Sequence, residues 1–372
     1  MSCPLADICG GCPQRNKSVS QYQSDKIAAV ERILSALPQP LPKGEPVFVA
    51  DGTRRRAALA FRYRRGKLTL GFNRHKSSEV IDVEACQLLT PALNAVLPAL
   101  RRLLTEVCAA PYQSKKGKKT ISQTVNAGDV WLCEAENGID VVLEYDAPLG
   151  LTHRMIMFEQ VSACPGIVRL SHRCSNTAAP EPVIEKAKPY IKIGGFDVFI
   201  PAGTFLQPSR EGEAALTGLV QKYLGDTTGK IFDLFCGVGT FSYVLAANQN
   251  NKVTAVDSSE ELLRGFRESV NRNCIANIEI ITRNLFKYPL DTAELQGAAA
   301  VVFDPPRAGA AAVVKMLCAA RPPKIIAVSC NPGTFVNDAA ALLAAGYRLE
   351  EITLVDQFTY SDHSELVALF TN

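Results

Sequence analysis

Three short motifs in the second half of this 372-residue chain contain residues that could do chemistry. The segment VSCNPGTF, residues 328–335, places Cys330 directly after the apolar run KIIAV, and Pro332 favours the start of a helix behind it. The segment FDPPRAG, residues 303–309, places Asp304 at the end of another apolar run. A thiol near the positive end of a helix is favoured as the nucleophilic thiolate. The alternative is that Cys330 is an inert core residue.

The third motif is DLFCGVGTF, residues 233–241. Its glycines, Gly237 and Gly239, let the backbone approach a ligand closely. Asp257 ends the next apolar run, where a carboxylate can accept hydrogen bonds from two ribose hydroxyls. Pyrophosphate-binding loops carry a third glycine, but Phe241 and Ser242 follow here. The motif therefore favours S-adenosylmethionine, which has no phosphate, over the cofactor of a nucleotide dehydrogenase.

Four of the twelve cysteines form a separate pattern. Cys3, Cys9 and Cys12 have the spacing C-x5-C-x2-C, and Cys86 could supply a fourth ligand from a distant strand. Four thiolates suit a [4Fe–4S] cluster or a structural zinc ion. The remaining cysteines other than Cys330 lack such spacing and are expected in the core.

The elements that must position the first three motifs begin at about residue 201. Apolar strand-like runs at 231–235, 252–257, 278–282, 299–304 and 324–329 alternate with helical stretches such as 258–273 and 331–346. This alternation predicts a parallel sheet covered on both faces. Two further runs, 348–358 and 365–371, have no helix between them and are predicted to be antiparallel. The layout is that of an α/β, class I (Rossmann-like) methyltransferase domain at residues 201–372.

Residues 1–200 have a different pattern. Short alternating segments separated by turn residues predict an antiparallel, β-rich domain. Because this part of the chain contains the four patterned cysteines and a basic stretch, we expect it to be the cluster- and RNA-binding domain. One helix is predicted over about 20–37, which could pack on the catalytic domain, and a second within 91–107.

The net charge of +3 is unevenly distributed. From Arg54 to Lys76 there are nine Lys and Arg residues and no acid, and KKGKK follows at 115–119. Cations interleaved with aromatic residues favour RNA phosphates and unstacked bases. The candidate RNA contacts are Arg54, Arg55, Arg56, Arg62 and Arg64. The alternatives are a solvated hairpin face and a mobile lysine loop.

Composition limits the location of the protein. It is 47% hydrophobic and 21% charged, which is ordinary for a folded protein. No apolar run approaches the ~18 residues that span a bilayer, and the start lacks the pattern of a secretory signal. We therefore expect a cytoplasmic monomer with reduced cysteines and no membrane partner.

Together, DLFCGVGTF, FDPPRAG and VSCNPGTF resemble the motifs of the RNA (uracil-C5) methyltransferases, and the resemblance covers nearly the whole chain. The segments CPLADICGGCPQ and DVEACQLL resemble that family's iron–sulfur motif. The basic stretch at residues 52–83 resembles the branch that acts on 23S rRNA. The amino-terminal RNA-binding barrel of several relatives is not found, so RNA affinity is expected to rest on the first 200 residues or on the fold of the substrate.

The resemblance implies methyl transfer from S-adenosylmethionine to C5 of a uridine in 23S rRNA, or alternatively in tRNA, through a cysteine–C6 adduct. It implies a [4Fe–4S] cluster on the four patterned cysteines. The alternative from a different class of protein is an RNA-binding or RNA-folding protein whose catalysis is secondary or lost.

The resemblance also assigns roles to residues. Cys330 matches the nucleophile and Glu365 the base. The run FTYSDHSE departs from the usual Phe-Pro-His-Thr, so Asp362 is a rival base, and His363 either orients the loop or is an ordinary surface residue. Matches to the family's cofactor contacts are Gln207, Phe235, Thr240, Asp257, Asn284 and Asp304, beside the loop glycines.

Overall fold

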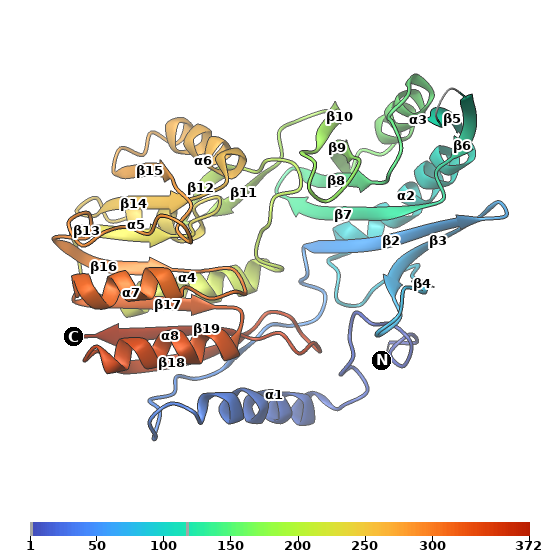
Figure 1. Ribbon diagram of the computed structural model, residues 1–372. Helices are drawn as coiled ribbons and strands as arrows, with labels where there is room; N and C mark the ends of the chain where they lie inside the picture. Colours follow the sequence, from blue (N-terminus) through green and yellow to red (C-terminus); the bar gives the residue numbers. More distant parts are fainter. Residues whose placement is uncertain (1–2, 117–118) are drawn as a thin grey trace. The chain divides into compact units, whose positions relative to one another are not determined.

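The computed structural model describes residues 3–116 and 119–372 (Figure 1). The chain forms two units. Unit 1 contains residues up to Asn16, Ala50–Ile191 and Ile200–Pro208, and unit 2 contains Lys17–Val49, Lys192–Phe199 and Ser209–Asn372. This division differs from the single boundary expected at residue 200. Residues 17–49 belong to unit 2 because their helix and strand complete its core and its sheet.

Unit 2 is built around an eight-stranded sheet with the order β1-β18-β19-β17-β16-β13-β14-β15. The strands are β1 Val47–Phe48, β13 Lys230–Leu234, β14 Lys252–Asp257, β15 Ile278–Thr282, β16 Ala298–Phe303, β17 Lys324–Ser329, β18 Arg348–Asp356 and β19 Glu365–Thr371. Strands β13 to β17 are parallel, whereas β19 is antiparallel to both β17 and β18. The predicted class I methyltransferase fold is therefore confirmed. The sequence did not predict β1, which pairs with β18 in parallel.

Helices cover both faces of this sheet, which explains why its strands are almost continuously apolar. On one face the core includes residues of α1 (Val19–Leu34), α7 (Ala311–Ala320) and α8 (Pro332–Ala344). On the other it includes residues of α4 (Arg210–Leu224) and α5 (Thr240–Ala246). Helix α6 (Glu260–Arg272) follows β14, and Ser269 on it accepts a hydrogen bond from Phe199 of β12 (Phe196–Phe199).

Unit 1 contains a seven-stranded sheet with the order β10-β9-β8-β7-β2-β3-β4. The strands are β2 Arg56–Arg64, β3 Lys67–Asn73, β4 Val80–Asp82, β7 Ala127–Ala135, β8 Gly138–Glu144, β9 Ile167–Arg173 and β10 Glu181–Glu185. Helices α2 (Pro91–Ala109) and α3 (Leu151–Ser162) share a core with it. The prediction of an antiparallel sheet is wrong for β8 and β9, which are parallel. The sequence analysis missed α3, the crossover that parallel neighbours require.

Two small hairpins complete the described structure. One pairs β5 (Pro111–Lys116) with β6 (Lys119–Thr124), and the other pairs β11 (Tyr190–Ile193) with β12. The predicted lysine loop KKGKK falls on the first hairpin, but Gly117 and Lys118 lie outside the described residues. Among the helices that the structure describes, none has both the length and the apolar character needed to cross a membrane.

Candidate active site

The carboxyl edge of the parallel strands in unit 2 gathers most of the predicted site residues. Phe235 to Thr240 follow β13, Asp257 ends β14, and Asn284 follows β15. Asp304 follows β16 and Cys330 follows β17. The carboxyl ends of neighbouring parallel strands lie at the same sheet edge, which is where open α/β sheets bind their ligands. Residues as far apart in the sequence as Phe235 and Cys330, 95 positions, thereby share one site.

The glycine loop is held by the carboxylate of Asp257. Gly237 N donates to Asp257 Oδ2 at 3.0 Å, and Ser259 N donates to Asp257 Oδ1 at 2.9 Å. Gly239 has φ 92°, and a Cβ on it would lie 2.4 Å from a ring carbon of Phe266, so only glycine fits there. A Cβ on Gly237, with φ 56°, would meet nothing within 4 Å. The loop thus offers open backbone beside a carboxylate, which fits the ribose of S-adenosylmethionine.

Two further predicted cofactor contacts lie close to aromatic surface. Phe235 adopts the unusual φ of 63° for a non-glycine residue, and its ring centroid lies 5.4 Å from that of Phe286. Asn284 Oδ1 accepts hydrogen bonds from the backbone N–H groups of Phe286, at 3.0 Å, and Lys287, at 3.1 Å. Phe286 stays 48% exposed. An exposed aromatic ring at this edge is suited to contact with a planar adenine.

Cys330 and Glu365 are brought together by the pairing of β17 with β19. The antiparallel ladder ends with the pair Ser329 and Leu366. Cys330 comes immediately after Ser329, and Glu365 immediately before Leu366, so the two are opposite in register at the sheet edge. Glu365 is only 5% exposed, whereas Cys330 is half-buried.

The sequence predicted a helix terminus that favours the thiolate of Cys330, whereas the surroundings in the structure favour the protonated thiol. The pKa of the Cys330 thiol is raised to about 11, mainly by burial and also by the charges of Glu365 and Asp304, while Arg307 opposes the rise. The start of α8 is capped by Asn331, whose side chain accepts from Gly333 N at 3.1 Å. Desolvation and two carboxylates therefore outweigh the helix terminus, and the resting thiol is protonated at neutral pH.

The surroundings of Glu365 also favour its protonated form. Its pKa is raised to about 8, mainly by burial and also by Asp304, while a hydrogen bond with Gln357 and the charges of Arg307 and Lys26 oppose the rise. Burial likewise raises the pKa of Asp304. The edge therefore holds three acidic groups that compete for protons, so their apparent pKa values belong to the group as a whole.

The rival base and its neighbour lie in the loop before β19. Asp362 and His363 are both exposed, in contrast to the buried Glu365. Arg307 Nη2 contacts His363 Nδ1 and lies 3.2 Å from Nε2, and the His363 ring centroid lies 5.6 Å from that of Phe358. His363 therefore packs within the loop, in line with an orienting role.

Gln207 lies in unit 1, in the segment 200–208. Gln207 is 8% exposed, and its backbone carbonyl oxygen accepts a hydrogen bond from Arg55 Nε at 3.1 Å. Arg55 is itself 1% exposed. Arg56 Nη1 donates to Leu206 O at 2.7 Å, and its guanidinium carbon lies 4.5 Å from the ring centroid of Phe205. Both arginines hold this segment.

The guanidinium groups of Arg55 and Arg56 thus bond to the protein backbone, and a role of these two arginines in RNA binding stays a prediction. The other three candidates differ. Arg54 is half-buried and lines the cysteine pocket. Arg62 is half-buried and donates to Phe61 O at 2.8 Å, whereas Arg64 is exposed. Arg62 and Arg64 stay candidates for RNA contacts.

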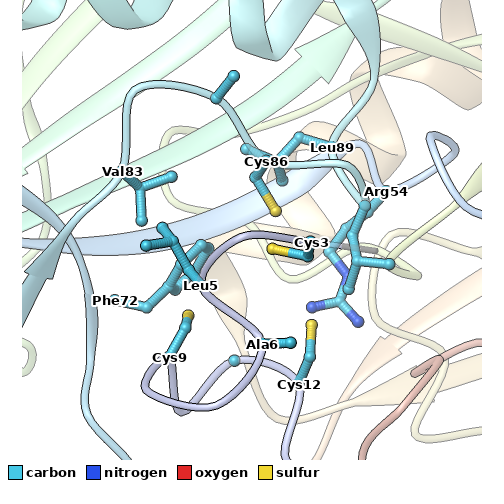
Figure 2. A pocket seen from close by; sticks show the side chains of 13 residues that line it. Cys3, Leu5, Ala6, Cys9, Cys12, Arg54, Phe72, Val83, Cys86 and Leu89 are labelled. Atoms are coloured by element: carbon cyan, nitrogen blue, oxygen red, sulfur yellow. The ribbon is translucent and has the colours of Figure 1, made fainter. Parts of the chain in front are cut away.

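The four patterned cysteines line a single pocket in unit 1 (Figure 2). Cys3, Cys9 and Cys12 come from the amino-terminal turns, and Cys86 comes from the segment between β4 and α2. Apolar side chains close the rest of the wall: Leu5, Ala6, Phe72, Val83, Ala85, Leu88 and Leu89.

The donor chemistry of this pocket suits a thiolate-bound metal group, with Arg54 as a nearby cation. Burial raises the pKa of Cys12 to about 12, and that of Cys9 is raised too. In the part of the chain that the structure describes, however, no three His, Cys, Asp or Glu side chains are arranged to hold a metal ion. The cysteines are gathered, but they do not form a closed ligand shell.

Some residues of this site were missed by the sequence analysis. Asp233 on β13 is fully buried and accepts from Ser242 Oγ at 2.5 Å. Lys26 on α1 is 3% exposed and lies 3.3 Å from Asp356. The sequence could have identified both residues as charges at apolar positions. Asp233 interrupts the apolar strand IFDLF, and Lys26 occupies the same helical face as Val30.

A half-buried thiol opposite a buried carboxyl group, at the same edge of a class I sheet as a glycine loop without the third glycine of pyrophosphate-binding loops, defines an S-adenosylmethionine-type methyltransferase site. Comparisons identify the family. The model of the tRNA (Uracil-5-)-methyltransferase family matches residues 199–372. An uncharacterized RNA methyltransferase of Agrobacterium fabrum is 33% identical over 97% of this chain and 82% of its own length.

The 23S rRNA (uracil(1939)-C(5))-methyltransferase RlmD of an Enterobacter species is 30% identical over 99% of this chain and 81% of its own length. The crystal structure of the Pyrococcus abyssi tRNA (uracil-54, C5)-methyltransferase with S-adenosyl-L-homocysteine matches with a TM-score of 0.74 at 23% identity, over 99% of this chain and 86% of that one, and so shares the fold. The chain belongs to the RNA (uracil-C5) methyltransferase family, whose members depend on S-adenosylmethionine.

Proposed function

We propose that this enzyme makes 5-methyluridine in 23S rRNA through a covalent adduct between Cys330 and C6 of the target uracil. The observation that carries the proposal is the register of β17 and β19, in which Cys330 and Glu365 follow and precede a paired Ser329 and Leu366, at the same sheet edge as Asp257 and the glycine loop. The named RlmD relatives support 23S rRNA as the substrate. A tRNA substrate is the alternative within the same chemistry.

Each residue has a defined task in this reaction. Cys330 loses its proton to solvent, and its Sγ forms a bond to C6 while the C5–C6 electron pair moves to C5. Bound S-adenosylmethionine supplies a sulfonium methyl group that C5 can attack. Glu365, as a carboxylate, then removes the C5 proton; the C5–C6 double bond forms again, and the bond between Sγ and C6 breaks.

The cofactor and RNA contacts are also proposals. Asp257 and the backbone of Gly237 would hold the ribose, and Phe235, Gly239, Thr240, Asn284 and Asp304 would complete the cofactor site. Gln207 would contact the cofactor or the base, on a segment fixed by Arg55 and Arg56. Arg62 and Arg64 would contact phosphates of an unpaired RNA whose target base is flipped out. The cytoplasmic location and the monomeric state stay predictions.

Methylation of defined transcripts tests this function. The protein should be incubated with methyl-labelled S-adenosylmethionine and either a 23S rRNA fragment or a tRNA, both made without modification. Nuclease digestion should yield labelled 5-methyluridine from the 23S fragment. Label only in tRNA would assign the alternative substrate, and label in neither RNA, with RNA still bound, would contradict the proposed activity.

We expect kcat for methylation to rise with pH from 6 to 8. Glu365 acts as a base only without its proton, and its pKa is raised to about 8, mainly by burial. Because the pKa of Cys330 is raised to about 11, its thiolate fraction also increases with pH over this range. A pH series of kcat includes the elimination step and reports the ionisations of the enzyme–substrate complex. A flat profile between pH 6 and 8 would contradict the proposed protonation states.

We further propose that Cys3, Cys9, Cys12 and Cys86 bind a [4Fe–4S] cluster. The support is the gathering of four thiols on one largely apolar pocket together with their resemblance to the family motif. Such a cluster would link the amino-terminal turns to the segment before α2, since its ligands come from both. All four cysteines belong to unit 1, whereas Cys330 and Glu365 belong to unit 2.

Anaerobically purified protein should be brown and contain about four iron atoms per chain. Cys12→Ser should lower the iron content and the melting temperature, because one of four ligands is lost. Cys174→Ser, which changes an exposed cysteine of the same unit, is the matched control and should leave both unchanged. One zinc and no iron per chain would replace the cluster with a structural zinc ion.

A further inference from the structure

Helix α1 contains a buried lysine that the proposed chemistry does not use. Tyr22, Lys26, Val30 and Leu34 form the buried face of the helix. Lys26 is 3% exposed, and Asp356, at the end of β18, is fully buried. Burial of an ion pair costs desolvation energy that a pair of apolar residues would avoid, so stability alone is a weak reason for this arrangement.

The contacts of Lys26 lie on both ends of the loop between β18 and β19. Its Nζ lies 3.3 Å from Asp356 Oδ1, before the loop. It donates to the carbonyl oxygen of Ser361 at 2.8 Å and to that of His363, near the end of the loop. Glu365 follows two residues after His363. One ammonium group thus joins three points of the segment that leads to the proposed base.

Tyr22 reinforces the same loop one helical turn away. Its hydroxyl donates to Asp356 Oδ2 at 2.5 Å, and its ring centroid lies 4.8 Å from that of Tyr360. Tyr360 adopts φ 60°, a left-handed conformation that is unfavourable for a tyrosine outside a constrained setting. The aromatic contact and the hydrogen bond of Tyr22 therefore help to fix the loop.

We propose that Lys26 is a positioning residue for the methylation reaction: it holds the 357–364 loop and supplies the positive charge that keeps Glu365 available as the base. The inference rests on the proposed role of Glu365 in eliminating the product. Lys26 acts through Glu365 and the loop, and Tyr22 contributes only to the position of the loop.

The effect of Lys26 on the ionisation of Glu365 depends on the other groups around Glu365. The acidic groups near Glu365 are Asp304 and Cys330, and the cations are Arg307 and Lys26. Gln357 is its hydrogen-bond partner. Asp356 and Asp362 in turn face Lys26. Arg307 is exposed and so screened by solvent, whereas Lys26 is buried and screened much less. Removal of the Lys26 charge should therefore make Glu365 harder to ionise.

The test replaces Lys26 with methionine, which is similar in length but uncharged, and compares it with Lys43→Met. Lys43 is an exposed lysine of the same unit that pairs with Glu31 of α1. For Lys26→Met we expect the rise of kcat with pH to move upward by about one pH unit, because kcat includes the elimination step in which Glu365 acts. We also expect slower release of the covalent protein–RNA complex, by about tenfold, with methyl transfer in a single turnover retained. Lys43→Met should match the unchanged protein in all three readouts.

Tyr22→Phe keeps the proposal testable if Lys26→Met does not fold. It removes the hydrogen bond to Asp356 but keeps the Lys26 charge, so the complex should persist longer without a change in the pH profile. The inference is overturned if folded Lys26→Met shows the unchanged pH profile and normal release, or if Tyr22→Phe releases product normally. Glu365→Gln distinguishes a failure of this inference from a failure of the proposed function. If this variant does not accumulate the covalent protein–RNA complex, Glu365 is not the base.

Discussion

Cys330→Ala is expected to abolish methylation of RNA, with single-turnover rates reduced by about 10⁴-fold or more. Without the thiol no bond can form to C6, and C5 of uracil does not gain the electron density needed to take a methyl group. RNA binding should be retained, because Cys330 is a half-buried residue at a sheet edge and not one of the proposed phosphate contacts. The measurement is transfer of labelled methyl groups together with RNA binding by filter retention.

Cys318→Ala is the matched control for this experiment. Cys318 is a partly buried cysteine of the same unit, on α7, and it is not part of the carboxyl edge of the sheet. Its removal should leave methylation unchanged. If Cys330→Ala still produces 5-methyluridine at a comparable rate, the covalent mechanism is wrong and the thiol at the end of β17 is a core residue.

Glu365→Gln is expected to trap the reaction after methyl transfer. The amide can no longer take the C5 proton, so elimination of Cys330 should slow by about 10²–10⁴-fold. A covalent protein–RNA complex carrying the transferred methyl group should then persist through denaturing electrophoresis. Glutamine keeps the shape of Glu365 and can still bond to Gln357, which should preserve the packing of this buried position.

Asp362→Asn provides the comparison, because Asp362 is the rival base three residues earlier in the sequence. It is exposed, while Glu365 is 5% exposed and opposite Cys330 in register. Asp362→Asn should turn over normally and leave no complex. The opposite pattern, normal turnover by Glu365→Gln and a persistent complex with Asp362→Asn, would transfer the role of base to Asp362.

The sequence predicted unit 2 well because the patterns that identify its strands and motifs lie within short stretches of the chain. Each strand of the parallel sheet is a short apolar run followed by a turn or helix signal, and each chemical motif comes directly after such a run. Because parallel strands end at one edge, this order alone placed Cys330, Asp304 and Asp257 together. The spacing of Cys3, Cys9 and Cys12 similarly indicated a shared site, and the structure gathers them with Cys86 in one pocket.

The first 200 residues were predicted less well for two physical reasons. Helix α3 has only a weak apolar pattern, since Leu151, Met155 and Phe158 on it are exposed, and without it the parallel pairing of β8 and β9 could not be foreseen. The arginines were interpreted from their charge, but Arg55 is buried against backbone carbonyls that come from residues more than 150 positions later. Neither fact is encoded in a local window of sequence.

By itself, the sequence determined the fold class, the position of the glycine loop and the identity of the nucleophile candidate, since these depend on residue types and on local periodicity. Only the tertiary structure decided the protonation of Cys330 and Glu365, the placement of β19 between β17 and β18, and the attachment of α1 to the loop before Glu365. A pKa depends on desolvation and on charges brought in by distant segments. Lys26 and Asp356 are separated by 330 residues along the chain and meet only through packing.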